Sequence, residues 1–235
     1  MKKPTGYVVY EGVSQLDGVS PIVGIITMKS SNVKTGNMAQ MWVMRSDIHP
    51  IDAKKASLDD AICGQCQFRQ SLGGACYVNL GHAPSAVYRT YSKGGYPVAE
   101  SLDIFVDMKV RFGAYGDVAA LPVSILATLK RYVKNNTSYT HQWKTNQDEA
   151  LKATSMASVD NLDEAQQAKD LGFRWFRVTN DINTLRDDEI ICPNTTHKTL
   201  CENCNLCSGN TIKAKSIVIE NHGTFKKNFK EKVAQ

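Results

Sequence analysis

Short apolar runs alternate with amphipathic segments along most of the chain. The run 38–44 (MAQMWVM) predicts a first strand, and segment 122–136 predicts a helix, because Pro122 stands at its start and apolar residues follow at helical spacing. Further strands are expected at 109–117, 138–143, 154–160, 173–178, 189–193 and 216–223, and further helices at 87–95, 100–108, 147–152 and 162–172. Strands and helices thus alternate at intervals of roughly 20 to 30 residues.

This alternation predicts an α/β fold with parallel strands joined by right-handed crossovers. No GxGxxG or GxxxxGK[ST] motif follows a predicted strand, which disfavours an open nucleotide-binding sheet. Polar residues follow several predicted strands, and in a barrel these strand ends share one mouth. We therefore expect a parallel (β/α) barrel, complete or partial, over residues 31–223. An N-terminal segment (1–30) would precede it, and a solvated basic tail (224–235) would follow.

Composition is that of an ordinary globular protein. The chain has 235 residues, of which 42% are hydrophobic and 22% charged, and its formal net charge is +5. This charge is compatible with an anionic partner, including nucleic acid, but is smaller than a dedicated DNA-binding protein carries. No apolar run predicts a membrane span or a signal peptide. We expect a cytoplasmic protein, in a reducing compartment where disulfides are rare.

All seven cysteines fall in two groups, of which the second has the more specific spacing. Cys192, Cys201, Cys204 and Cys207 follow the pattern C-x8-C-x2-C-x2-C in a Cys-rich loop (192–210) near the C-terminus. Four thiolates complete a metal site of the kind that holds zinc or an iron–sulfur cluster. The overlapping CxxCxxC run favours a [4Fe–4S] cluster, with zinc as the alternative.

The first group consists of Cys63, Cys66 and Cys76, in the spacing C-x2-C-x9-C after the first predicted strand. Three thiolates are one fewer than a closed site needs, and reactive metal sites keep one position open. A [4Fe–4S] cluster held in this way has one open iron, which can bind S-adenosylmethionine and, when reduced, cleave it to a carbon radical. The alternative is a structural zinc site completed by His49 or His82.

A cysteine-rich loop that follows the first strand of a barrel and ends in Cys-aromatic resembles the radical S-adenosylmethionine superfamily. The usual spacing in that superfamily is C-x3-C-x2-C, from which this chain departs. The resemblance implies a [4Fe–4S] cluster, S-adenosylmethionine and an auxiliary cluster at the C-terminal cysteines. It also implies cofactor contacts near the strand ends: Tyr77 at the adenine, Gly113, Gly116 and Asp117 at the methionine end, and Ser158 and Asp160 at the ribose.

A second resemblance covers most of the chain. It is to a family of uncharacterised proteins encoded by phages and other mobile elements, and it implies a phage context and location in the host cytoplasm without naming a reaction. The similarity rests on NVKTGNMAQMWVMRSDIHP, CGQC…ACYVNLGHAPSAVYR, VRFGAYGDVAALP, YTHQW and CENCNLC.

Other polar residues near strand ends are candidates for chemistry. Asp117 ends one predicted strand and His141 lies near the end of the next, and we expect both to be catalytic. Glu220 and His222, at the end of the last predicted strand, are expected at the mouth. The turn 31–37 (SNVKTGN) either holds a phosphate or carboxylate through Lys34 and its backbone amides or only leads into the first strand.

Three functions remain open on these observations. The first is an iron–sulfur enzyme of radical S-adenosylmethionine type, of phage origin, acting on an unknown substrate. The second is a zinc-stapled module that binds nucleic acid or a host protein without catalysis. The third is a nucleotide- or base-modifying enzyme in which all metal is structural and Asp117 performs acid–base or nucleophilic work.

Overall fold

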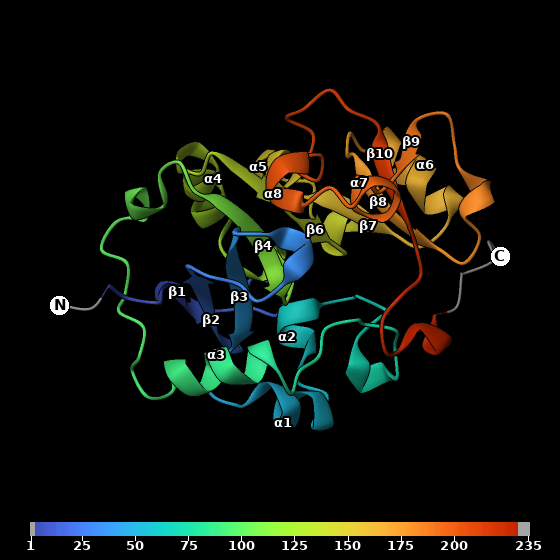
Figure 1. Cartoon of the computed structure of the whole chain (residues 1–235). Coiled ribbons are helices and arrows are strands. Elements are labelled where there is room, and N and C mark those ends of the chain that lie inside the picture. The colour runs from blue at the N-terminus through green and yellow to red at the C-terminus, as the bar shows by residue number, and fades with distance from the viewer. Residues whose placement is uncertain (1–2, 230–235) are drawn as a thin grey trace.

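The computed structural model describes residues 3–229. Within them the strands form two five-stranded sheets, in the orders β1-β2-β3-β4-β5 and β6-β7-β8-β10-β9 (Figure 1). The strands are β1 (Gly6–Val13), β2 (Pro21–Thr27), β3 (Ala39–Arg45), β4 (Lys109–Tyr115), β5 (Asn135–Thr137), β6 (Tyr139–Thr140), β7 (Met156–Val159), β8 (Trp175–Thr179), β9 (Glu189–Ile191) and β10 (Ser216–Glu220). The α-helices are α1 (Pro50–Lys55), α2 (Asp60–Cys63), α3 (Ala83–Tyr91), α4 (Val123–Tyr132), α5 (Glu149–Thr154), α6 (Leu162–Asp170), α7 (Pro193–His197) and α8 (Cys201–Cys204). The predicted α/β class is confirmed.

Parallel pairing dominates beyond β3. Strands β3, β4 and β5 are parallel, and every pairing described within the second sheet is parallel. Only Ser138 separates β5 from β6, so the chain passes from one sheet directly into the other. The backbone of Ser138 stays paired there, because its N–H donates to Cys207 O and its carbonyl accepts from Met156 N, both at 3.0 Å. Helices α1 and α3 pack against β3, and α6 packs against β7 and β8.

The N-terminal hairpin is the main element that the sequence pattern did not predict. Strands β1 and β2 pair antiparallel with each other, and β2 pairs antiparallel with β3. Six of the seven residues of β2 are buried. The continuous apolar run PIVGIIT lacks the alternation that marks a half-buried strand, because both faces of β2 are covered.

Several predicted boundaries shift for local reasons. Helix α4 ends at Tyr132 rather than 136, because residues 135–137 pair with β4 as strand β5. The strand predicted at 138–143 is limited to Tyr139–Thr140, since Gln142–Lys144 turns into a 3₁₀ helix. The segment 100–108 contains only a 3₁₀ helix, Leu102–Phe105.

The last described residues of the expected basic tail contact the protein. In Figure 1 the chain runs from β10 back towards the segment that follows α2. Phe229 is buried with its ring centroid 5.5 Å from that of Phe68, and Asn228 Nδ2 donates to Gly73 O at 2.9 Å. Asn228 and Phe229 are therefore held against the protein, residues 224–228 are exposed, and residues 230–235 of the expected tail lie outside the described residues.

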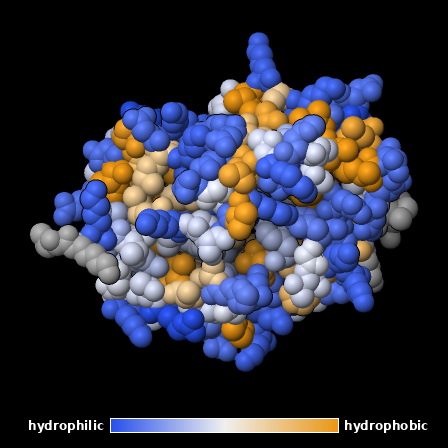
Figure 2. Space-filling view, viewed as in Figure 1, coloured by the Kyte–Doolittle hydropathy of each residue, from blue (hydrophilic) through white to orange (hydrophobic). Residues whose placement is uncertain are grey.

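The surface is largely polar on the face seen in Figure 2, where hydrophobic side chains appear in small separate groups. None of the helices within residues 3–229 combines the length and apolarity needed to cross a membrane.

Candidate functional site

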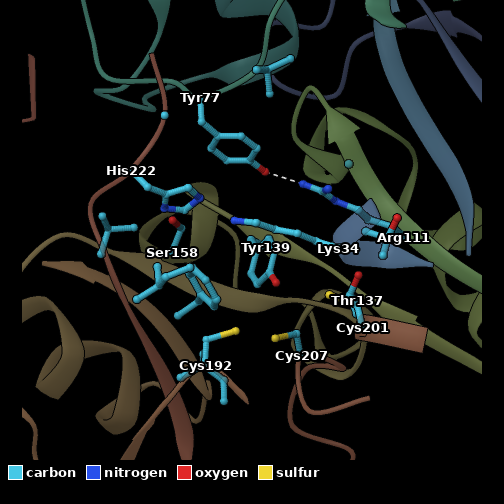
Figure 3. Close-up of a pocket in the computed structure, with 18 of the residues that line it drawn as sticks. Lys34, Tyr77, Arg111, Thr137, Tyr139, Ser158, Cys192, Cys201, Cys207 and His222 are labelled. Atoms are coloured by element: carbon cyan, nitrogen blue, oxygen red, sulfur yellow. Dashed lines mark hydrogen bonds between the residues drawn. The ribbon is translucent and has the colours of Figure 1, made fainter. Parts of the chain in front are cut away.

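All seven cysteines line one cavity of about 500 Å³. Its walls come from side chains along and just beyond the parallel strands, and Figure 3 shows ten of them labelled. The lining residues that belong to the strands include Arg111, Thr137, Tyr139, Ser158, Phe176 and Ile217. The two cysteine groups thus face the same cavity, although Cys63 and Cys192 are 129 positions apart in the sequence.

The first cysteine group lies on a loop (residues 63–76, the three-cysteine loop) that is fixed to three strand ends. The N–H of Asp117, after β4, donates to Ile62 O at 2.6 Å, directly before the loop. Gln142, after β6, donates through Nε2 to Cys63 O at 3.0 Å. Gln67 Nε2 donates to Asp160 Oδ2, after β7. These bonds hold the loop across the carboxyl ends of the strands.

The thiols of this loop sit in a buried and acidic environment. Burial raises the pKa of Cys63, and the neighbouring thiols of Cys66 and Cys76 raise it further, as do Asp59 and Asp117. Burial likewise raises the pKa of the other two thiols. Thiolates here would need nearby positive charge, which a metal centre provides.

Backbone N–H groups are aimed at two of these sulfurs. The Sγ of Cys66 accepts from the N–H of Phe68, and that of Cys76 accepts from the N–H of Val78. In each case the donor is two residues further along the chain. Such bonds favour the charged thiolate, which is the form that ligates a metal.

The second group consists of Cys192, Cys201, Cys204 and Cys207 (the four-cysteine group). In Figure 3, Cys192 and Cys207 lie on the opposite side of the cavity from Tyr77. The sulfurs of Cys192 and Cys207 point towards one another there. Burial raises the pKa of Cys207 to about 12, although the hydroxyl of Tyr139 donates to its sulfur. Here too a backbone N–H, from the residue two positions on, is aimed at the sulfur of Cys204.

Two sets of contacts fix the loop that carries the four-cysteine group. Arg174 donates to four backbone carbonyls, those of Leu206 (2.8 Å), Gly209 (2.9 Å), Ala214 (2.8 Å) and Lys215 (2.6 Å). Glu202, in α8, accepts at Oε2 from the N–H of Asn37 at 2.9 Å, and its carbonyl accepts from Lys109 Nζ. The loop is therefore held against both the second sheet and the turn that precedes β3.

Neither cysteine group is arranged as a compact single-ion site. Among residues 3–229, no set of three or more His, Cys, Asp or Glu side chains is placed to hold one metal ion. His49, one of the two fourth ligands considered for zinc, accepts from Ile51 N at 3.4 Å and packs edge-on against Tyr88. His82, the other, is exposed before α3 and does not line the cavity.

Asp117 and His141, the expected catalytic residues, both line the cavity. Asp117 accepts from Ala119 N (3.0 Å), His141 N (2.8 Å) and Thr140 Oγ1 (3.1 Å), so its carboxylate joins the ends of β4 and β6. Burial raises its pKa, against the effect of these hydrogen bonds. This arrangement fits a positioning role at least as well as proton transfer, and the catalytic role stays a prediction.

The His141 imidazole is buried and lacks a partner at one nitrogen. Its Nε2 has no hydrogen-bond partner within residues 3–229, and its ring packs edge-on against Phe68, with centroids 5.5 Å apart. Burial lowers the pKa of His141 to about 4. The side chain is therefore neutral at pH 7 and can accept or donate a hydrogen bond towards a ligand in the cavity.

Most of the expected cofactor contacts also reach the cavity. Tyr77, Gly113, Gly116 and Ser158 line it, whereas Asp160 does not and instead accepts a hydrogen bond from Gln67 of the three-cysteine loop. Gly116 has a φ of +75°, and a Cβ there would lie 2.3 Å from the carbonyl oxygen of Val43. Only glycine allows β4 to end this close to β3.

Arg111 is the site residue that the sequence analysis missed. It lies within β4, is 9% exposed, and lines the cavity. Its Nη2 donates to the hydroxyl of Tyr77, whose ring in turn stacks on His222 with centroids 5.9 Å apart. The signal in the sequence was a charged residue in the middle of an otherwise apolar strand, in VRFGAY.

Comparison of the chain with protein-family models, with curated proteins and with solved structures found no match.

Proposed function

We propose that this protein is an iron–sulfur enzyme of radical S-adenosylmethionine type. The three-cysteine loop would hold a [4Fe–4S] cluster through Cys63, Cys66 and Cys76, and the four-cysteine group would hold a second, auxiliary cluster. A cluster with three thiolate ligands supplies an open iron that binds S-adenosylmethionine and the electron that cleaves it. The observation that carries the proposal is that both groups face one cavity at the ends of parallel strands.

The residues around the three-cysteine loop fit a cluster of this kind. The acidic side chains Asp59 and Asp117 act on its buried thiols, so that a metal centre would supply the missing positive charge. The backbone N–H groups aimed at two of the sulfurs favour the thiolate form. Gln67, Gln142 and Asp117 hold the loop at the strand ends, which keeps the three thiols in place without a metal having to order the chain.

The cavity walls support contacts with S-adenosylmethionine. Tyr77, directly after Cys76, is about half exposed. Gly113, Gly116 and Ser158 border the same space. In the proposal Tyr77 packs on the adenine, the two glycines let the methionine end approach β4 closely, and Ser158 bonds the ribose.

We also propose that the parallel strands form an open (β/α) barrel in the order β3-β4-β5/β6-β7-β8-β10-β9. The support is the direct passage of the chain from β5 to β6 across Ser138, which links the two sheets at adjacent strands. Side chains from β4 to β8 and from β10 face one cavity, as the inward-facing residues of a barrel do. A phage origin and activity in the host cytoplasm belong to the same proposal and rest on the sequence resemblance.

Metal analysis of anaerobically purified full-length protein tests this function. We expect brown protein with about eight irons and eight labile sulfides per chain, corresponding to two [4Fe–4S] clusters. With a reductant and S-adenosylmethionine, it should form 5′-deoxyadenosine. Colourless protein that holds two zinc ions would overturn the proposal and favour a zinc-stapled binding module.

Two cysteine variants, one in each group, separate the two clusters. Cys66→Ser should retain about half of the iron and lose cleavage of S-adenosylmethionine. Cys204→Ser should also lose about half of the iron but keep cleavage without a substrate, because the cluster it affects does not bind the cofactor. Equal loss of cleavage in both variants would contradict this division of roles.

A further inference from the structure

Arg111 is a buried cation that no carboxylate neutralises. Only 9% of the residue is exposed, and no Asp or Glu within residues 3–229 lies within ion-pair distance of its guanidinium. An arginine has five N–H donors, and Tyr77 is the side chain in the described part of the protein that accepts from one of them. Burying a charge in this way is costly unless something pairs with it.

The other buried arginines show what pairing looks like in this protein. Arg45 contacts Asp47 at 2.7 Å, and Arg177 contacts Glu189 at 2.7 Å. Arg111 differs from both in lining the cavity, where its free N–H groups can reach a ligand.

A second cation reaches the same space. Lys34, in the turn before β3, lines the cavity, and Figure 3 draws it between His222 and Arg111. Within residues 3–229 Lys34 forms no ion pair either. Arg111 and Lys34 are both close enough to the Cys201 sulfur to interact with it electrostatically, which places them beside the four-cysteine group. Tyr139 and Phe176 line the same cavity, with their ring centroids 4.4 Å apart.

We propose that Arg111 and Lys34 bind an anionic group, carboxylate or phosphate, of the substrate. An arginine fork matches two oxygens of such a group, and a flexible lysine adds a point charge from the turn. Tyr77 holds the guanidinium in position through its hydroxyl. The assignment of this anion to a substrate rests on the proposed function, whereas binding of the anion itself does not.

Offsetting the charge of the four-cysteine group is the competing role for the two cations. Arg111 and Lys34 both act on Cys201, and a cluster with four thiolates is negative. The two roles differ in one measurable respect. A pair of cations that serves only the thiolates binds no added anion, whereas a receptor for the substrate does.

Calorimetric titration of full-length, anaerobically prepared protein with inorganic phosphate and with succinate, at constant ionic strength, tests the proposal. We expect saturable binding of at least one anion, and the tighter one identifies the group as phosphate or carboxylate. Arg111→Gln should weaken this binding about tenfold to a hundredfold, because charged hydrogen bonds in a buried site are lost. Lys34→Gln should weaken it less, and Arg111→Lys should restore part of the affinity.

Arg131→Gln is the matched control, because Arg131 is exposed on α4 and does not line the cavity. Failure of the unaltered protein to bind either anion would overturn the proposal, as would equal weakening in the control. If Arg111→Gln weakened binding of S-adenosylmethionine as much as it weakened binding of the anion, the proposal would also be overturned, because the arginine would then belong to the cofactor site. Should Arg111→Gln not fold, unchanged anion binding in Lys34→Gln decides against the proposal.

Iron content is measured on every preparation. Protein that holds zinc or no iron would refute the proposed function without affecting the result for anion binding.

Discussion

The parallel strands have one face towards the cavity and one towards the helices. A buried arginine on the helix face is paired with a carboxylate, whereas a buried arginine on the cavity face is not paired within residues 3–229. Arg177 on β8 and Arg111 on β4 are both buried arginines in strand interiors. Phe176 and Val178, the neighbours of Arg177, line the cavity, so alternation directs Arg177 to the opposite face, which packs against α6. Arg111 faces the cavity itself.

On the helix face the charge is completely enclosed. Arg177 donates to both carboxylate oxygens of Glu189, at 2.8 and 2.7 Å, and to Thr184. Glu189 also accepts from Trp175 Nε1 at 2.8 Å and from Arg186 N at 3.0 Å. Every group in this network is used within the protein, so the network serves the fold. The unpaired cation on the cavity face serves stability poorly, which points to a ligand.

Among the variants that test this difference, Glu189→Gln is expected to have the largest effect on stability. It leaves the Arg177 guanidinium buried without an opposite charge, and we expect the free energy of unfolding to fall by about 3–5 kcal/mol. Chemical denaturation at pH 7 measures it. Asp188→Asn is the control, because Asp188 forms ion pairs with Lys169 and Arg186 near the surface, and its loss should cost less than about 1 kcal/mol. Equal losses in the two variants would mean that the buried network is not special.

Most of the elements from β3 onward could be predicted because their signals in the sequence are local, whereas the N-terminal hairpin of β1 and β2 could not. Strand and helix alternate in the pattern itself, and helix α6 has its cap at Asn161, whose side chain accepts from Glu164 N at 2.8 Å. The cysteine spacings were equally visible. The sequence pattern could not predict that the three-cysteine loop and the four-cysteine group face one cavity, because this depends on strand pairings between residues far apart in the chain.

The same reason explains why Arg111 was missed. Whether a charged residue in a strand is paired depends on which acidic side chains the fold brings near it. For Arg177 that partner is Glu189, twelve positions away, on a strand that is separated from β8 by β10. No sequence pattern distinguishes the paired arginine from the unpaired one, and only the three-dimensional arrangement does.

The pH dependence of stability extends the comparison to His141, a second polar side chain on the cavity face with a buried nitrogen that lacks a partner in the described residues. Its pKa is about 4 in the folded protein, below the ordinary value of 6.5. Between these pH values the unfolded chain binds a proton that the folded protein does not, so stability falls as pH is lowered from about 6.5 to about 4. The contribution of His141 to this fall is up to about 3 kcal/mol.

The His141 effect is isolated by comparing variants. His141→Gln should unfold with a shallower pH dependence than the unaltered protein over that interval, whereas His82→Gln, at an exposed position, should follow the unaltered protein. Denaturant titrations at pH 7, 6, 5 and 4.5 give the curves. Parallel curves for His141→Gln and the unaltered protein would show that the imidazole finds a partner, and the contrast between the two faces would then be confined to Arg111.

The smallest expected effect is the one that separates the two arginines most directly. Arg111→Leu removes a buried charge that has no carboxylate partner among residues 3–229, so the free energy of unfolding should stay unchanged or rise by about 1 kcal/mol. Arg177→Leu, made in parallel, leaves Glu189 buried and unpaired and should lower it by about 3–5 kcal/mol. Denaturation of both variants at pH 7, without added anion, measures the difference. A large loss of stability in Arg111→Leu would mean that the guanidinium stabilises the fold. The argument that Arg111 is there to bind an anionic ligand would then lose its basis.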